Sequence, residues 1–189
     1  MKRLLIFASG SGSNAQRIIE YFQNDDAVEV VLVLSNKPQA KVLERATHLK
    51  VSAFSFNRTA FYETDQVFNL VKQNNPDLII LAGFLWLMPQ NLITAFAGKI
   101  INIHPALLPN YGGKGMYGSH VHEAVVAAGE KESGITIHHV TSEYDKGSII
   151  FQAKTQLEEG ETAESLAEKI HKLEYEHFPR VIAEVLEEQ

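Results

Sequence analysis

The sequence predicts an α/β protein with a doubly wound, mostly parallel sheet that carries helices on both faces. Short apolar runs alternate along the chain with segments of helical length, which is the pattern of repeated βαβ units. The runs are almost continuously apolar, as expected for strands that are covered on both faces. A turn rich in glycine and serine follows the first run, so the N-terminal half is expected to be Rossmann-like.

Strands are expected where short apolar or β-branched runs end in turn residues. The first run ends at Ser9-Gly10, the second at Ser35-Asn-Lys-Pro38, and the fifth at Pro105. Two runs rich in β-branched and aromatic residues follow in the C-terminal half. The expected strands are residues 4–8, 28–34, 51–54, 78–82, 100–103, 134–140 and 148–156.

Helices are expected between these strands, where apolar residues recur at helical spacing. The last helix opens at Thr162-Ala-Glu-Ser165, which resembles a capping box, and we expect Pro179 to interrupt it. Residues 110–118 contain four glycines and are expected to form a loop with unusual backbone freedom. The expected helices are residues 14–23, 40–49, 59–73, 89–96, 119–128 and 162–188.

Composition narrows the class of protein. A length of 189 residues predicts a single domain that spans residues 1–189. The hydrophobic content of 45% is ordinary for a globular protein. The net charge of −6 disfavours nucleic-acid binding. The sequence has no cysteine, which excludes a disulfide and a thiol nucleophile and fits a cytoplasmic location. No apolar segment has the length of a membrane span, so we expect no membrane partner.

An asparagine and a histidine mark the end of the fifth expected strand. Asn102 and His104 are two residues apart, so their side chains should point to the same face where Pro105 ends the strand. An amide can donate a hydrogen bond to a developing oxyanion, and an imidazole can move a proton near neutral pH. Asp145 lies downstream and is suited to orient such a histidine. The alternative is a buried Asn–His pair with a purely structural role.

The turn after the first strand suggests a phosphate site. Its sequence, Ser9-Gly-Ser-Gly-Ser-Asn-Ala15, matches G-x-G-x-x-G/A between a strand and a helix. A dinucleotide site would also require an acidic residue near position 35, where this chain has Ser35 and Asn36. We therefore favour a monophosphate site formed by Ser11, Gly12, Ser13 and Asn14. The alternative is a turn in which Ser13 or Asn14 only caps the helix.

Several other chemistries find no support in the sequence. It contains no Walker motif, no H-E-x-x-H zinc motif and no G-x-S-x-G nucleophile elbow. The histidine pairs His120/His122 and His138/His139 have no third ligand placed by the sequence, so we expect them to be solvated or structural. No metal is expected.

Four motifs occur in order along nearly the whole chain: Ser9-Gly-x-Gly-Ser-Asn14, Leu81-Ala-Gly-Phe84, Asn102-Ile-His-Pro-Ala-Leu-Leu-Pro109 and His138-x-Val-x-x-x-Tyr-Asp145. On these motifs the chain resembles the glycinamide ribonucleotide formyltransferases, a family of folate-dependent enzymes with the formyltransferase fold. The Asn-x-His-Pro segment and the later aspartate are typical of all formyl-folate transferases. The phosphate turn and the single-domain length narrow the resemblance, because methionyl-tRNA formyltransferase and formyltetrahydrofolate deformylase carry an extra domain.

The resemblance implies transfer of a formyl group from 10-formyltetrahydrofolate to the amine of 5-phosphoribosylglycinamide, in purine synthesis. It assigns the oxyanion to Asn102, general acid–base catalysis to His104, and the orientation of His104 and a bound water to Asp145. It assigns the ribose to Glu174, with His171 at a neighbouring position, and the phosphate to Ser11–Asn14. The pterin is assigned to Leu85, Trp86, Leu87, Met88, Asn102, Thr141, Ser142, Glu143, Tyr144 and Asp145. The two small molecules are the implied partners, and monomer and homodimer remain open.

The chain departs from the family pattern at the folate. Well-known members have a basic residue where this chain has Trp86, and an arginine where it has Thr59. The adjacent Arg58 is the expected substitute for binding the glutamate tail. The loop at residues 112–118 is longer than in some members and is expected to move over the site. Two other functions remain open: a deformylase-like hydrolase, and a non-catalytic nucleotide-binding protein of the same fold.

Overall fold

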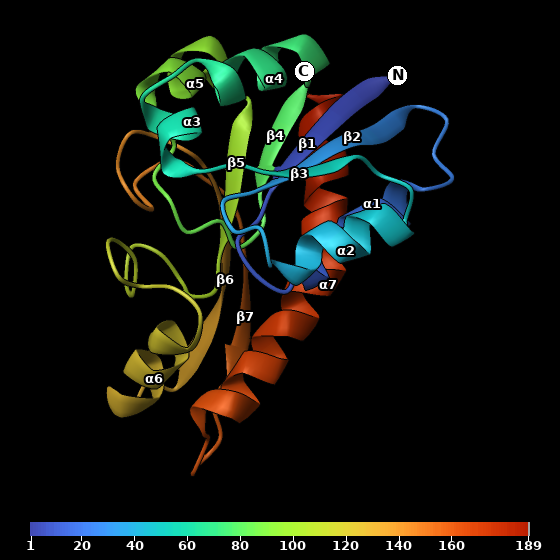
Figure 1. The fold of residues 1–189 in the computed structure, drawn as a ribbon. Coiled ribbons are helices and arrows are strands. Elements are labelled where there is room, and N and C mark those ends of the chain that lie inside the picture. The colour runs from blue at the N-terminus through green and yellow to red at the C-terminus, as the bar shows by residue number, and fades with distance from the viewer. Residues whose placement is uncertain (189) are drawn as a thin grey trace.

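The computed structural model describes residues 1–188, and all its strands form one sheet in the order β3-β2-β1-β4-β5-β6-β7 (Figure 1). The pairs from β3 to β5 are parallel, whereas β6 pairs antiparallel with both β5 and β7. The predicted doubly wound, mostly parallel sheet is therefore confirmed. The strands are β1 Lys2–Phe7, β2 Val28–Ser35, β3 Ala53–Ser55, β4 Leu78–Leu81, β5 Ile100–His104, β6 Glu132–His139 and β7 Ile149–Gln156.

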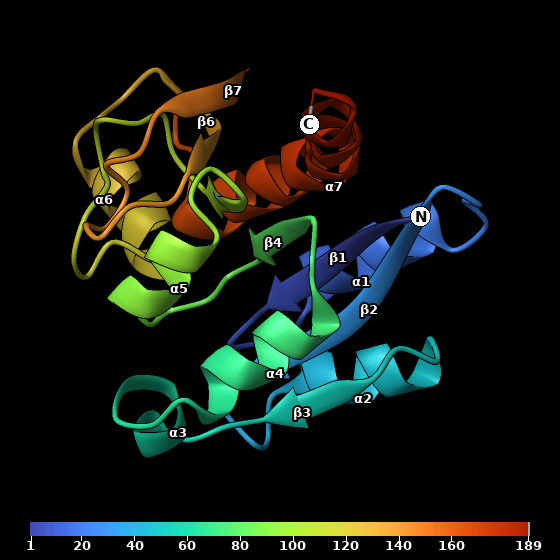
Figure 2. The ribbon, with the colours of Figure 1, turned by 90° about the horizontal axis from the view of Figure 1, so that it is seen from above.

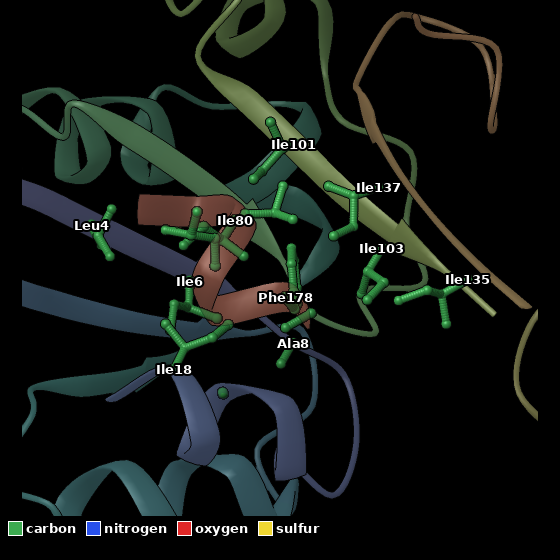
Figure 3. Close-up of a cluster of buried hydrophobic side chains, with 14 of the residues drawn as sticks. Leu4, Ile6, Ala8, Ile18, Ile80, Ile101, Ile103, Ile135, Ile137 and Phe178 are labelled. Carbon is green, nitrogen blue, oxygen red and sulfur yellow. The ribbon is translucent and has the colours of Figure 1, made fainter. Parts of the chain in front are cut away.

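Helices cover both faces of the sheet (Figure 2). Because side chains alternate along a strand, Leu4 and Ile6 of β1 face one core, whereas Leu5 and Phe7 face the other. The first core, shown in Figure 3, also contains residues of α1, α2, α6 and α7, and the second contains residues of α3, α4 and α5. The helices are α1 Ser13–Phe22, α2 Lys41–His48, α3 Arg58–Tyr62, α4 Gln66–Asn74, α5 Gln90–Ala95, α6 Ser119–Ala127 and α7 Ala163–Glu187.

Two helix predictions were wrong in detail. The single helix expected at residues 59–73 is two helices, because Glu63 and Thr64 both donate their amides to the carbonyl of Thr59 and close the first one. The last helix is not interrupted at Pro179 but runs continuously from Ala163 to Glu187. Proline inside a helix costs about 3 kcal/mol, and the fully buried side chains of Phe178, Val181 and Ile182 offset that cost on both sides of it.

The order in which strands are added to the sheet reverses between β1 and β4. From β1 the chain proceeds to β2 and β3 on one side, and from β4 it proceeds to β5 on the other. The two strand ends stay together, since the amide of Ser9 donates to the carbonyl of Gly83 at 3.0 Å. Ligands of open α/β sheets bind at such a switch point, outside the carboxyl ends of the strands.

Within residues 1–188, no helix combines the length and the apolar character that crossing a membrane requires.

Candidate active site

A cleft of about 670 Å³ opens at the carboxyl ends of β1, β4 and β5. It brings together segments that are far apart in the sequence, including the predicted phosphate turn and the predicted Asn–His pair. Its walls include residues 9–14, 81–88, 102–105 and 113–118, parts of residues 138–145, and His171 and Glu174 of α7.

Asp145 is the centre of the polar contacts in this cleft. Its Oδ2 lies 3.6 Å from Nδ1 of His104 and accepts a hydrogen bond of 2.9 Å from the amide of Gly113. Its Oδ1 accepts a hydrogen bond of 3.5 Å from Nδ2 of Asn102 and lies 3.5 Å from Nε2 of His138. One carboxylate therefore contacts both members of the Asn–His pair, which places the two side chains on the same face of β5.

His104 is 3% exposed, and both of its ring nitrogens face acceptors. Nε2 donates to the carbonyl of Tyr111 at 2.7 Å, so in the neutral ring Nε2 carries the proton. Nδ1 faces Asp145 and carries a proton only in the imidazolium form. A proton that arrives at Nδ1 is therefore stabilised by the carboxylate beside it.

Burial and charge act in opposite directions on these two groups. Burial lowers the pKa of His104 below its usual value, and the attraction of Asp145 and the Tyr111 carbonyl offset only part of that effect. Burial alone would raise the pKa of Asp145, but the neighbouring rings of His138 and His104 and the Gly113 amide together lower it. The site thus combines an ionised carboxylate with an imidazole that gives up its proton readily.

The amide of Asn102 is oriented by its neighbour on the next strand. Asn102 and His138 are directly opposite each other in the antiparallel β5–β6 pair. Nδ1 of His138 donates to the carbonyl of His139 at 2.8 Å, which leaves Nε2 to accept from Nδ2 of Asn102 at 3.1 Å. Both partners of Nδ2 are acceptors, so the N–H side of the amide is directed toward Asp145 and the ring.

The chain just after His104 is anchored by a buried threonine. Oγ1 of Thr136 donates to the carbonyl of Ala106 at 2.7 Å and accepts from the amide of Leu108 at 3.0 Å. Nε2 of Gln152 donates to the same hydroxyl at 2.9 Å. Strands β6 and β7 therefore hold the segment that follows the Asn–His pair.

The predicted phosphate turn lies at the start of α1. Gly12 is the N-cap residue with a φ of 75°, and no side chain caps the helix. The alternative in which Ser13 or Asn14 acts as a plain helix cap was therefore wrong. Nδ2 of Asn14 instead donates to Oε2 of Glu174 at 2.9 Å, joining the turn to α7. Burial raises the pKa of Glu174, partly offset by the bond from Asn14 and the charge of His171.

The predicted folate segment, residues 85–88, forms another wall of the cleft. The amide of Leu85 donates to Oγ of Ser9 at 3.0 Å, which links this segment to the end of β1. The Trp86 ring lies about 6 Å from those of Phe61 and Tyr62, and the Arg58 guanidinium lies 5.8 Å from its centroid. Thr141, Glu143 and Tyr144 also line the cleft, whereas Arg58 and Ser142 do not.

The cleft also contains residues that the sequence analysis did not assign to the site: Lys37, His122, His138 and the amide of Gly113. His138, expected to be solvated or structural, is not solvated, because it is buried and contacts Asn102 and Asp145. His122 is also buried, and its Nδ1 has no hydrogen-bond partner. A signal for His138 was present in the motif His138-x-Val-x-x-x-Tyr-Asp145. Over residues 1–188, the structure has no cluster of three His, Asp or Glu suited to a metal ion.

The chain is similar over nearly its whole length to proteins of one family. A profile of the formyl transferase family matches residues 2–182. A phosphoribosylglycinamide formyltransferase of Bacillus subtilis is 37% identical over 98% of this chain and 95% of its own. A chloroplastic phosphoribosylglycinamide formyltransferase of Arabidopsis thaliana is 36% identical over 100% of this chain and 66% of its own. The crystal structure of glycinamide ribonucleotide transformylase 1 from Geobacillus kaustophilus matches with a TM-score of 0.89 at 38% identity, over 98% of this chain and 99% of that one.

Proposed function

The chain belongs to the formyl transferase family, and we infer that it catalyses the reaction for which its relatives are named. It is a phosphoribosylglycinamide formyltransferase that transfers a formyl group in purine biosynthesis. The formyl donor is 10-formyltetrahydrofolate, and the acceptor is the amine of 5-phosphoribosylglycinamide. The observation that carries this conclusion is the contact of Asp145 with both Asn102 and His104, inside a cleft that also contains the phosphate turn.

We propose that these three side chains carry the chemical step. The substrate amine attacks the formyl carbon, and the formyl oxygen becomes an oxyanion. Asn102 donates a hydrogen bond to that oxyanion. This hydrogen bond is stronger in the transition state than in the substrate. His104 takes up the proton that the attacking amine loses and passes it to the leaving folate nitrogen. Asp145 stabilises the imidazolium form of His104 while the proton is in transit.

The reaction requires hydrogen bonds of the structure to be exchanged. Nδ2 of Asn102 now donates to His138 and Asp145, and one of these bonds gives way to the oxyanion. Nε2 of His104 now donates to the carbonyl of Tyr111, next to the glycine-rich loop. A reacting group that accepts from Nε2 takes the place of this carbonyl. We propose that residues 112–118 shift when the substrates bind, which releases His104.

The acceptor is proposed to lie along the phosphate turn. The phosphate is bound by Ser11, Gly12, Ser13 and Asn14 at the N-terminus of α1, where backbone amides and the helix dipole favour an anion. Glu174 accepts hydrogen bonds from the ribose hydroxyls, and His171 lies beside it on α7. The hydrogen bond from Asn14 to Glu174 supports this assignment, because it ties the two proposed subsites together.

The folate is proposed to occupy the opposite part of the cleft. The pterin is bound by residues 85–88, Asn102 and residues 141–145, where an apolar wall and backbone groups suit a flat heterocycle. Arg58 is proposed to bind the glutamate tail. Its guanidinium lies over the rings of Tyr62 and Trp86, at the edge of the proposed folate wall.

Replacing Gly12 with valine is expected to raise the Michaelis constant for the ribonucleotide far more than that for the folate. A Cβ at Gly12 would lie 2.5 Å from Val42 of α2, and the φ of 75° is itself unfavourable for a branched side chain. The turn must therefore move away from α2, which misaligns its amides. Steady-state kinetics with each substrate varied in turn measures the two constants.

The matched control is Gly98→Val, at a residue with a φ of 74° and nothing within 4 Å of its Cβ position. It carries the same backbone cost, about 1–2 kcal/mol of stability, at a site away from the cleft. Equal increases of both Michaelis constants in a folded Gly12→Val enzyme would contradict the phosphate assignment.

Binding of a folate analogue is expected to change the fluorescence of Trp86. This residue is the only tryptophan of the chain and lines the cleft, so the signal has a single source. Displacement of water from the indole and contact with the pterin alter its emission. Titration with inorganic phosphate is the control and should leave the spectrum nearly unchanged. A spectrum that does not respond to saturating folate analogue would argue against the proposed pterin wall.

Formyl transfer itself is tested by incubating the enzyme with 10-formyltetrahydrofolate in the presence and absence of the ribonucleotide amine. Loss of the formyl-folate signal only when the amine is present supports the transferase. Loss without the amine would indicate hydrolysis by a deformylase-like activity. No loss in either case would indicate a binding protein of the same fold.

We further propose that residues 1–189 form one domain, which the single continuous sheet supports.

A cytoplasmic location is proposed from the cysteine-free composition, although plant relatives carry the word chloroplastic in their names. The substrates are small molecules, and size-exclusion chromatography with light scattering decides between a monomer and a homodimer.

A further inference from the structure

Three successive carbonyls of the phosphate turn, those of residues 10–12, each accept a hydrogen bond. The carbonyl of Gly10 accepts from the amide of Val42 at 3.2 Å, and that of Gly12 accepts from the amide of Gln16 at 2.8 Å. Between them, the carbonyl of Ser11 accepts from Nε of Arg45 at 2.8 Å. Val42 and Arg45 both belong to α2, which contributes no residue to the wall of the cleft. Helix α2 therefore supports the turn from the side opposite the proposed phosphate.

The direction of these carbonyls determines the direction of the amides. A trans peptide is planar, so its C=O and N–H groups point in opposite directions. Within residues 1–188, the one cis peptide is at Leu108–Pro109, far from the turn in the sequence. Since the carbonyls of Gly10 and Ser11 point to α2, the amides of Ser11 and Gly12 point away from it, toward the cleft. Successive amides with a common direction form an anion-binding concavity.

Arg45 is the one side chain among these three donors, and it is itself held in place. Its Nη1 donates to Oε1 of Gln16, and Nε2 of Gln16 donates to Oε1 of Glu20 at 2.7 Å. The planar guanidinium therefore binds the turn and α1 at once, which a lysine cannot do with the same geometry. Its contacts are to neutral oxygens, so this cation fixes a peptide plane and not an acidic side chain.

We propose that Arg45 is a positioning residue for the substrate phosphate: by binding the Ser11 carbonyl from behind, it aims the Gly12 amide at the phosphate. This inference rests on the proposed phosphate site. Arg45 does not touch the substrate, the folate or the reacting atoms. Its role is to keep the turn in the conformation that binds the phosphate before the substrate arrives, which lowers the cost of ordering on binding.

Replacing Arg45 with alanine is expected to raise the Michaelis constant for the ribonucleotide by about 10- to 100-fold, the usual size of a lost hydrogen bond to a charged group. The turnover number at saturating ribonucleotide and the Michaelis constant for the folate should change little. Inorganic phosphate should lose potency as a competitive inhibitor by a similar factor. A general loss of structure would lower turnover and affect both substrates.

Two further variants separate positioning from simple charge attraction. Arg45→Lys retains the charge and should remain clearly impaired, whereas attraction at a distance predicts nearly normal binding. Lys41→Ala removes an exposed cation from the same helix and should leave both constants unchanged. Added ethylguanidinium ion should restore part of the ribonucleotide affinity of Arg45→Ala and should have no such effect on the Lys41 variant.

The outcome also distinguishes failure of this inference from failure of the phosphate assignment. Asn14→Ala removes a proposed phosphate ligand directly and serves as the reference. If Asn14→Ala raises the Michaelis constant for the ribonucleotide and Arg45→Ala does not, the phosphate site stands and the role of Arg45 is overturned. If neither variant changes it, the phosphate binds elsewhere and both proposals fail. If Arg45→Lys behaves as wild type, Arg45 acts through its charge and the positioning role is overturned.

Discussion

Replacing His104 with alanine is expected to slow single-turnover formyl transfer by about 10²–10⁴-fold, the usual contribution of general acid–base catalysis. The ring is buried beside Asp145, and no other imidazole in the described part of the chain has the same pair of contacts to that carboxylate and to the Tyr111 carbonyl. The proton of the attacking amine then has no nearby acceptor of suitable pKa. Rapid-quench measurement with the enzyme in excess over 10-formyltetrahydrofolate reports this step without product release.

The control for this variant is His120→Ala, which removes an exposed histidine of α6 that does not line the cleft. Its rate should be close to that of the wild type. Binding of both substrates should survive in His104→Ala, because His104 is assigned to neither the phosphate nor the pterin. A near-normal rate in the folded variant would remove His104 from the mechanism and leave positioning alone to explain catalysis.

A double variant that combines His104→Ala with Asn102→Ala tests whether His104 and Asn102 act on one intermediate. Loss of an oxyanion donor alone is worth about 10²–10³ in rate. Because the oxyanion and the migrating proton belong to the same transition state, the double variant should be little slower than the slower single variant. Fully multiplicative losses would indicate that the two side chains act in separate steps.

The parts of the site that sequence could predict depend on local spacing. Asn102 and His104 share a face because a strand has a period of two, and this holds whatever lies on the neighbouring strands. The phosphate turn likewise follows from a short apolar strand, small residues and a helix start within one segment. Asp145 could be named as a candidate from its carboxylate and its place downstream, but its position beside the pair does not follow from local spacing.

Contacts that depend on register between distant segments were not predictable. His138 meets Asn102 because β6 pairs antiparallel with β5 in one register, and a shift of one residue would turn His138 to the other face. Arg45 meets the Ser11 carbonyl only because α2 packs against the turn, with Val42 in contact with Gly12. The carbonyl of Tyr111 carries no side-chain signal at all. A single sequence contains no signal that predicts any of these three contacts.

The two wrong helix predictions have different causes. Pro179 is a strong local signal for a helix break, but the helix continues through it, with Phe178 and Val181 packed in the core on both sides. The division at residues 63–65 follows from local backbone bonds to Thr59, which compete with continuation of the helix. Tertiary packing decided the first case, and turn chemistry decided the second.

Replacing Asp145 with asparagine is expected to slow formyl transfer by about 10²–10⁴-fold, since loss of the carboxylate removes the charge that stabilises the imidazolium. The shape of the side chain is retained, so the substrates should still bind. Because the charge of Asp145 raises the pKa of His104 against the effect of burial, that pKa should fall further in the variant. The limb of the pH–rate profile that reports on His104 should therefore move to lower pH.

Glu123→Gln is the matched control, because it removes a carboxylate from the exposed face of α6, outside the wall of the cleft. It should change neither the rate nor the position of the limb. The shift separates an electrostatic role of Asp145 from a purely structural one, since loss of packing would lower the rate at every pH without moving the profile. A slow Asp145→Asn enzyme with an unmoved profile would mean that Asp145 holds the Gly113 amide and the loop in place, and that His104 is tuned by burial alone.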